Sequence, residues 1–182
     1  AEFVFGVVDA SLTCELLAAD GDAVTAGQRV LRIAGPAKSI LIGERLALNF
    51  IQRMSGIASR TAAIMASFAG TKCAVLDTRK TMPGLREFEK MAVRLGGGTN
   101  HRMGLYDMIL VKDNHVDYAG SMAQALENVA AYLKAEQSNI PVVVEVRDAD
   151  EAVAAMAART EWQKPDGSPL VDRLLLDNHT PA

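Results

Sequence analysis

Short apolar runs broken by turn residues predict a small β element at the start of the chain. Residues 2–8, rich in β-branched and aromatic side chains, and the apolar run of residues 12–18 predict two short strands. The residues that follow, up to 33, include the turn dipeptide Asp20-Gly21 and predict a turn-rich hairpin region. No lysine lies at a hairpin tip, which disfavours a carrier domain for lipoyl or biotinyl groups.

A long helix is predicted next. Gly35-Pro36 ends the β pattern, and Ser39 is the expected N-terminal cap of the helix. Its apolar positions recur three, four or seven residues apart: Leu46, Phe50, Met54, Ile57, Ile64 and Phe68. Arg45, Asn49 and Arg53 share another face and form either a solvated surface or a functional one.

Beyond Gly70, short continuous apolar runs alternate with helical ones. The expected strands are residues 73–76, 108–111, 142–146 and 174–176, and the expected helices are residues 83–95, 121–135 and 150–158. Continuous apolar strands that alternate with helices indicate a parallel sheet covered on both faces, and therefore an α/β fold. Residues 162–169 contain two prolines and one glycine, which predicts an exposed loop.

Polar groups at the strand ends distinguish between α/β folds. They are Asp77-Thr78-Arg79-Lys80 after the first strand, Lys112-Asp113-Asn114 after the second, Glu145 in the third and Asp177-Asn178 after the fourth. A barrel delivers every strand end to one face, whereas a doubly wound sheet does so only near its switch point, and a full barrel needs about 250 residues. We therefore predict an incomplete αβ barrel over residues 71–182. Part of a small α+β N-terminal domain, with the long helix, is predicted over residues 1–70.

Charge is distributed unevenly along the 182 residues. From Glu44 to Lys112 there are eleven Lys and Arg against five Asp and Glu, a local balance of +6, whereas the whole chain carries −3. The remainder therefore carries −9, and this asymmetry indicates an anionic ligand held in one region. The sequence pI of about 5.6 disfavours a general nucleic-acid binder.

The apolar runs and the cysteines predict a cellular location. No run reaches the roughly 18 residues of a membrane span, and no export leader precedes the first expected strand. Cys14 and Cys73 fit two reduced, buried thiols better than a disulfide. We expect a cytoplasmic protein with neither membrane nor nucleic-acid partners.

Four cations near strand ends could neutralise three or four negative charges: Arg79, Lys80, Arg102 and Lys112. The planar fork of Arg suits carboxylates and phosphates, while Lys supplies a compact charge, so the expected ligand carries both groups. Alternatively, these cations pair at the surface with Asp77, Asp107 and Asp113.

Two acids, Glu145 and Asp177, lie in or just after apolar runs, where an unpaired carboxylate is costly. They either pair with Lys80 or Lys112, or hold a hard cation such as Mg²⁺ with water between. His101, which lies between Asn100 and Arg102, is expected to donate a hydrogen bond to an anion.

The remaining candidates have mainly structural interpretations. Gly96-Gly97-Gly98 ends the preceding helix, and its backbone either approaches an anion or only turns the chain. The histidines, including His115 and His179, lack the spacing of a zinc site. Cys73 is expected in the core rather than as a nucleophile.

Six segments of the chain form a specific ordered set. They are E-R-L-A-L-N-F-I-Q-R-M-S-G-I-A (44–58), D-T-R-K-T-M-P-G-L-R (77–86), G-G-G-T-N-H-R-M-G-L-Y-D (96–107), K-D-N-H (112–115), V-E-V (144–146) and L-L-D-N (175–178). Together they resemble the quinolinate phosphoribosyltransferase family, also called nicotinate-nucleotide pyrophosphorylase (carboxylating). The resemblance covers residues 8–178 and implies an open αβ barrel with an α+β N-terminal domain.

The resemblance also implies an activity. Family members transfer the phosphoribosyl group of phosphoribosyl pyrophosphate to quinolinate with Mg²⁺ and release pyrophosphate and CO₂. The product, nicotinate mononucleotide, enters NAD biosynthesis. A homodimer or higher homo-oligomer is expected, with sites shared across the subunit interface.

Residue roles follow from the resemblance position by position. It implies that the quinolinate carboxylates are bound by Arg45, Arg79, His101 and Arg102, with Arg45 supplied by the other subunit. It implies that Lys80 and Lys112 lie between quinolinate and pyrophosphate, and that Glu145 and Asp177 face the ribose hydroxyls and the metal.

The chain departs from the family pattern in three ways. Val143 replaces the first acid of an E-V-E-V run, residues 162–169 resemble an insertion, and relatives extend beyond both ends of this chain. We therefore expect most of the quinolinate pocket without most of the phosphate-binding segments, and an inactive fragment is one outcome. The alternatives are a non-catalytic anion-binding or dimerisation module, and a related barrel enzyme with another small anionic substrate.

Overall fold

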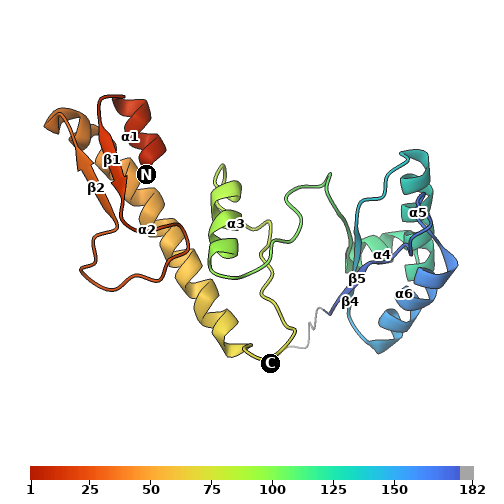
Figure 1. Ribbon diagram of the computed structural model, residues 1–182. Helices are drawn as coiled ribbons and strands as arrows, with labels where there is room; N and C mark the ends of the chain where they lie inside the picture. The colour runs from red at the N-terminus through yellow and green to blue at the C-terminus, as the bar shows by residue number, and fades with distance from the viewer. Residues whose placement is uncertain (177–182) are drawn as a thin grey trace. The chain divides into compact units, whose positions relative to one another are not determined.

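A computed structural model describes residues 1–176 of the chain (Figure 1). The chain gathers into two compact units, Ala1–His101 and Arg102–Ala182. Helices and strands contribute to both units, and the predicted α/β class is confirmed. The boundary that we placed between residues 70 and 71 stays a prediction.

The first element, α1 (Glu2–Val8), is a helix, so the strand predicted here is wrong. Phe3 and Val7 are 82% and 71% exposed, whereas Phe5 is 2% exposed. The Phe5 ring packs on Gly43 of α2 (Ala37–Ser67), where an added Cβ would lie 2.9 Å from a ring carbon. Burial of one helical face therefore outweighs the β propensity of this run, a preference of only about 1 kcal/mol.

The predicted hairpin is confirmed. Strands β1 (Thr13–Leu16) and β2 (Leu31–Ala34) pair in antiparallel register. An exposed ion pair of 2.6 Å joins Arg32 Nη1 to Glu15 Oε2 across the two strands. The hairpin leads directly into α2.

The long helix α2 is confirmed, but its predicted cap is wrong. The helix begins at Ala37, with Pro36 before it, and makes no side-chain capping bond. Ser39 instead donates its hydroxyl to Asp9 Oδ2 at 2.6 Å, and this hydrogen bond lowers the pKa of the Asp9 carboxyl. The serine therefore ties α2 to the end of α1.

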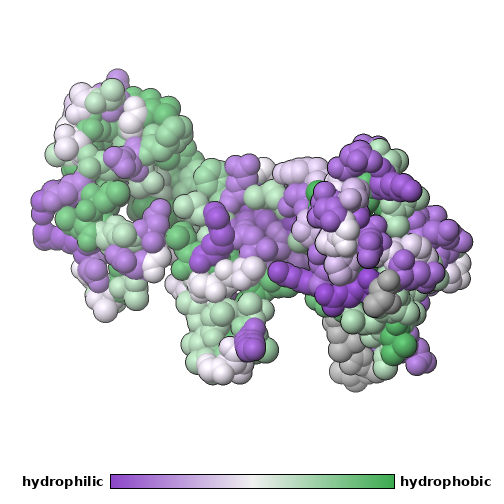
Figure 2. Space-filling view, turned by 45° about the vertical axis from the view of Figure 1, so that its right-hand side comes forward, coloured by the Kyte–Doolittle hydropathy of each residue, from purple (hydrophilic) through white to green (hydrophobic). Residues whose placement is uncertain are grey.

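The buried face of α2 differs in part from the predicted stripe. Gly43, Ala47 and Thr61 are its buried residues, whereas Leu46 and Phe68 are exposed. Apolar side chains of α1 and of the first turns of α2 remain exposed: Phe3, Val7, Leu41, Ile42 and Leu46. Figure 2 shows hydrophobic surface in green over this end of the first unit.

The segment 73–76, predicted as a strand, forms only one parallel bridge, between Leu76 and Thr99. With so little pairing, the segment stays at the surface. Cys73 is exposed, so its predicted place in the core is wrong. Both cysteines of the chain are free thiols.

Helix α3 (Arg86–Leu95) packs against α2. It starts three residues later than predicted, because Leu85 N–H donates to Met82 O at 3.0 Å and closes a turn first. At its end, a Cβ on Gly96 would fall inside van der Waals contact with the Ala58 carbonyl and 2.7 Å from Thr61 Cβ. Of the two interpretations of the glycine run, the structure therefore supports the close helix end.

The second unit contains a parallel sheet. Its strands are β3 (Ile109–Val111), β4 (Val142–Val146) and β5 (Arg173–Leu176), in the order β3-β4-β5. All five residues of β4 are buried, so both faces of the sheet are covered, as predicted. Its core is formed by β4 and the helices, with Leu126, Leu133, Val142, Val144, Ala155 and Leu170 among the buried residues.

The helices of this unit are α4 (Asp113–Ala119), α5 (Met122–Ala135) and α6 (Ala149–Glu161). Ser121 and Asp148 cap α5 and α6 through their side chains. Helix α4 was not predicted, because Val116 is its only buried residue and so little periodicity marks it.

The loop 162–169 is mostly exposed, as predicted, but Lys164 within it is buried. The Lys164 side chain is 4% exposed, and its Nζ lies 2.6 Å from Asp172 Oδ2. The same carboxylate oxygen accepts the N–H of Val142 at the start of β4. The loop is thus fastened to the sheet by a buried lysine. No helix within residues 1–176 is long and apolar enough to cross a membrane.

We predict that Gly96→Ala destabilises the protein by about 1–3 kcal/mol, because the added methyl group must push α3 away from α2. Gly56→Ala is the matched control, since nothing lies within 4 Å of a Cβ added at that helical position. It should be neutral or stabilise by up to about 1 kcal/mol. Urea unfolding measures both, and equal effects of the two substitutions would contradict the close approach.

Candidate active site

Two of the predicted clusters follow neighbouring backbone segments in the first unit. Thr99 N–H donates to Val75 O at 2.8 Å, and Asp77 N–H donates to Thr99 O at 3.2 Å. The segments run in parallel here, so both continue past the same edge. Arg79-Lys80 follows one of them and His101 follows the other.

A buried ion pair fixes this edge. Lys90 of α3 pairs with Asp77 Oδ1, and the two side chains are 1% and 5% exposed. The same oxygen accepts the backbone N–H of His101 at 2.8 Å. Asn100 Nδ2 in turn donates to the Lys90 carbonyl at 3.2 Å. One aspartate and one lysine therefore hold α3 and both segments together.

Asp77 was considered above as a surface partner for the four predicted cations. Its ion pair is instead made with Lys90 and is buried. Asp107, in the second unit, accepts the N–H groups of Met103 and Gly104 at 2.7 and 2.8 Å and so closes its own loop.

Three polar atoms at this edge are buried without a hydrogen-bond partner among the described residues. They are Asp77 Oδ2, Arg79 Nε and Asn100 Oδ1. Buried polar atoms almost always have a hydrogen-bond partner, so a bound water or ligand is the expected partner of each of these three. Their clustering beside the predicted anion-binding residues favours a ligand at this edge.

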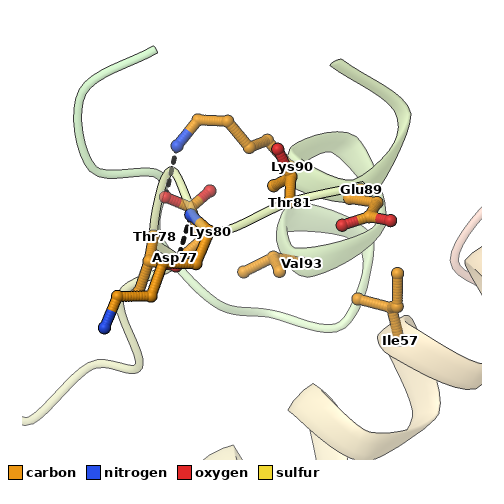
Figure 3. Close-up of a pocket in the computed structure, with 8 residues that line it drawn as sticks. All are labelled: Ile57, Asp77, Thr78, Lys80, Thr81, Glu89, Lys90 and Val93. Atoms are coloured by element: carbon orange, nitrogen blue, oxygen red, sulfur yellow. Dashed lines mark hydrogen bonds and ion pairs between the residues drawn. The ribbon is translucent and has the colours of Figure 1, made fainter. Parts of the chain in front are cut away.

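A pocket of about 200 Å³ lies beside the ion pair (Figure 3). It is lined by Ile57, Asp77, Thr78, Lys80, Thr81, Glu89, Lys90 and Val93. In Figure 3 the Lys90 side chain reaches from α3 to Asp77, while the Lys80 side chain extends away from that pair. The pocket combines an apolar wall with charged groups, as sites for small polar ligands do.

The cations on α2 differ from one another. Arg53 donates from Nε to Glu89 Oε1 at 2.8 Å, which joins α2 to α3 and gives Arg53 a structural role. Arg45 and Asn49 are exposed on the helix surface. Arg53 therefore has a structural role on this face of α2, whereas Arg45 is exposed to solvent.

The second unit brings two further predicted residues together. In the register of β3 and β4, Val111 lies beside Val144, so the next residues, Lys112 and Glu145, are neighbours. Lys112 Nζ lies 3.3 Å from Glu145 Oε2, and the side chains are 42% and 6% exposed. Of the alternatives for Glu145, pairing with Lys112 is the one observed. The lysine remains open to a ligand.

His115 supports Lys112 through the backbone. Its Nδ1 accepts the N–H of Lys112 at 3.0 Å, three residues earlier at the start of α4. This hydrogen bond requires an unprotonated Nδ1, so the ring proton of the neutral imidazole is on Nε2. The last predicted acid, Asp177, and also His179, lie outside the described residues.

The described donors do not form a metal site by themselves. Within residues 1–176 there is no group of three His, Cys, Asp or Glu side chains that could hold a metal ion. Glu145, the described member of the predicted metal pair, forms an ion pair with Lys112. These residues alone do not form a protein cage for Mg²⁺.

Family models match almost the entire chain. The N-terminal domain model of quinolinate phosphoribosyl transferase matches residues 1–55, and the C-terminal domain model matches residues 57–182. The chain belongs to the quinolinate phosphoribosyl transferase family. The resemblance inferred from the six segments is therefore confirmed.

Individual family members are similar over nearly the same range. The quinolinate phosphoribosyltransferase [decarboxylating] 1 of Nicotiana glauca is 44% identical, and the chloroplastic nicotinate-nucleotide pyrophosphorylase [carboxylating] of Arabidopsis thaliana is 43% identical; each match covers 98% of this chain and 49% of the relative. The crystal structure of NadC from Streptococcus pyogenes matches with a TM-score of 0.86 and 42% identity, over 98% of this chain and 59% of that one. The chain thus spans about half the length of the curated relatives it matches.

Two supporting residues of the chain were not predicted. Lys90 was counted only as part of the regional charge, although it lies next to the apolar run Met91-Ala92-Val93 of α3. A lysine on the inner face of an amphipathic helix signals a buried partner. His115 was considered only as a zinc ligand and rejected. The signal missed was its position three residues after Lys112, where a capping box has its side-chain acceptor.

We predict that His115→Ala lowers the free energy of unfolding by about 1 kcal/mol, because the Lys112 N–H loses its acceptor. His115→Gln should retain most of the stability, since glutamine at this helical position can accept the same N–H. Urea unfolding of the two variants measures the difference. Equal losses in both would argue against a capping role of the imidazole.

Proposed function

We propose that the protein containing this chain transfers the phosphoribosyl group of phosphoribosyl pyrophosphate to quinolinate. Pyrophosphate and CO₂ are released, and the product is nicotinate mononucleotide for NAD biosynthesis. The observation that carries this proposal is the parallel junction at Leu76 and Thr99, which leads the Arg79-Lys80 and His101 segments of the family motifs past one edge. Because the chain spans about half the length of its curated relatives, we propose the activity for the whole protein.

Quinolinate binding is assigned to four residues. Arg79 and His101 approach the two carboxylates from the edge that Asp77 organises, and Arg102 follows His101 directly. Arg45, exposed on α2, serves the site of the other subunit. Guanidinium groups bind carboxylates through paired, charge-assisted hydrogen bonds, which suits a planar dianion.

The transfer step breaks the bond from ribose C1 to pyrophosphate while the quinolinate nitrogen bonds to C1. Positive charge develops on the sugar and negative charge on the leaving group. By the family resemblance we assign Lys80 and Lys112 to stabilise the leaving group, and Glu145 and Asp177 to face the sugar. The half-exposed Lys112 side chain supports this role, because a ligand can reach its ammonium group.

Decarboxylation follows from the charge of the ring. Once the nitrogen carries the ribose, the cationic ring can hold the electron pair left when the 2-carboxylate departs as CO₂. A proton then takes the place of the carboxylate. No covalent nucleophile is needed, so neither cysteine has a catalytic role.

Mg²⁺ remains an expected participant. Glu145 and Asp177 would be the protein's ligands, and the pyrophosphate oxygens of the sugar donor would supply further ones. Mg²⁺ commonly binds through one or two carboxylates together with substrate phosphates. When bound, it neutralises phosphate charge.

We further propose a homodimer or higher homo-oligomer in the cytoplasm. The oligomer is supported by the exposed apolar residues of α1 and α2, which include Phe3 and Ile42. The free Cys14 and Cys73 fit a reducing compartment.

Calorimetry of the chain with quinolinate tests the binding half of the proposal. We expect quinolinate to bind more tightly than nicotinate, which has one carboxylate fewer. Arg102→Ala should raise the Kd for quinolinate by roughly tenfold or more, the effect of losing a charge-assisted hydrogen bond. Arg159→Ala, an equal loss of charge at an exposed position of α6, is the control and should leave the Kd unchanged.

The release of CO₂ and pyrophosphate, measured in the presence of phosphoribosyl pyrophosphate and Mg²⁺, tests the reaction of the whole protein. Binding of quinolinate without any release would favour a non-catalytic module. An Arg102→Ala variant that binds as the unmodified chain does would contradict the site assignment.

A further inference from the structure

Lys90 cannot act as an ordinary ligand-binding cation. Its side chain is 1% exposed, and its ammonium group is used by Asp77. The pair nevertheless borders the pocket of Figure 3 and contacts the two segments that carry Arg79, Lys80 and His101.

The contacts of Lys90 reach both segments at once. Its ammonium group holds Asp77, two residues before Arg79, while its carbonyl accepts the side-chain N–H of Asn100 at 3.2 Å. Asp77 then uses the oxygen that binds Lys90 to accept the N–H of His101 at 2.8 Å. A single lysine therefore connects α3 to the residues just before each group of proposed quinolinate ligands.

Simple stability does not explain such a pair. Moving a lysine and an aspartate out of water costs several kcal/mol per ion, and an apolar pair of similar volume is often equally stable or more so. The ion pair instead fixes an orientation, because Asp77 can orient the His101 backbone only while Lys90 holds its carboxylate. Asp77 Oδ2 and Asn100 Oδ1 have no partner among the described residues, so both groups also keep acceptor capacity.

We propose that the buried Asp77–Lys90 pair is a positioning element, in which Lys90 sets the affinity for quinolinate by orienting the Arg79-Lys80 and His101 segments without touching the ligand. This inference rests on the proposed function for its ligand. The structural part of the inference, that the pair holds the His101 backbone in place, does not depend on the proposed function.

Three variants separate positioning from stability. Lys90→Met removes the ammonium group and leaves Asp77 buried and unpaired. Asp77→Leu combined with Lys90→Met replaces the pair by apolar side chains, which should restore much of the lost stability. Arg94→Met removes an equal charge from an exposed position of α3 and is the control.

We expect Lys90→Met to raise the Kd for quinolinate roughly 10- to 100-fold, the usual cost of a small misplacement of binding groups. The apolar double variant should remain weak in binding although its unfolding midpoint recovers, and Arg94→Met should bind as the unmodified chain does. In the absence of ligand, the backbone amide proton of His101 should exchange with solvent faster in the double variant and at an unchanged rate in Arg94→Met. NMR measures these exchange rates.

Normal quinolinate affinity in the folded double variant would overturn the positioning role, as would unchanged exchange at His101. If Lys90→Met does not fold, the double variant carries the test. If the unmodified chain binds no quinolinate, the proposed function fails. The exchange rate of the His101 amide proton then decides whether the pair holds the His101 backbone.

Discussion

The edge of the first unit that carries the motif segments depends on one buried electrostatic contact, between the carboxylate of Asp77 and the ammonium group of Lys90. The segment before Asp77 has too little β pairing to fix its own position, because one bridge at Leu76 and Thr99 is all that joins it to its neighbour. The ion pair supplies what the pairing lacks. It ties the segment to α3, and α3 is itself packed on the long helix α2 through the close approach at Gly96. Rigid helices therefore determine where the cationic clusters stand.

The second unit solves the same problem in another way. Here the parallel sheet is complete enough to set the register, and Lys112 and Glu145 become neighbours because their strands are paired. Glu145 is buried and Lys112 is half-exposed, so the carboxylate holds the ammonium group while leaving it open to an anion. His115 fixes the backbone at the same point. In each unit, a buried acid orients a group that belongs to a family motif.

The elements with strong periodicity were predictable from the sequence, and those with weak periodicity were not. The apolar run of β4 and the long apolar repeat of α2 clearly predicted a strand and a helix. Helix α4 buries only Val116 and has no such pattern. The β-branched and aromatic residues around Phe5 matched a strand, but contacts with α2 decided for a helix. At the site, the motif residues were visible because they carry charge near strand ends. Lys90 was missed because its role depends on a partner 13 positions away that only the packing of α3 reveals.

The most direct test of this dependence is a double-mutant cycle on the free energy of unfolding, with Asp77→Asn, Lys90→Met and the two combined. Each single substitution leaves one buried charge without its partner, so each should cost about 3–5 kcal/mol. The double variant should lose much less than the sum, with a coupling energy of about 2 kcal/mol or more. Additive losses, with a coupling energy below about 0.5 kcal/mol, would contradict the claim that this pair holds the edge together.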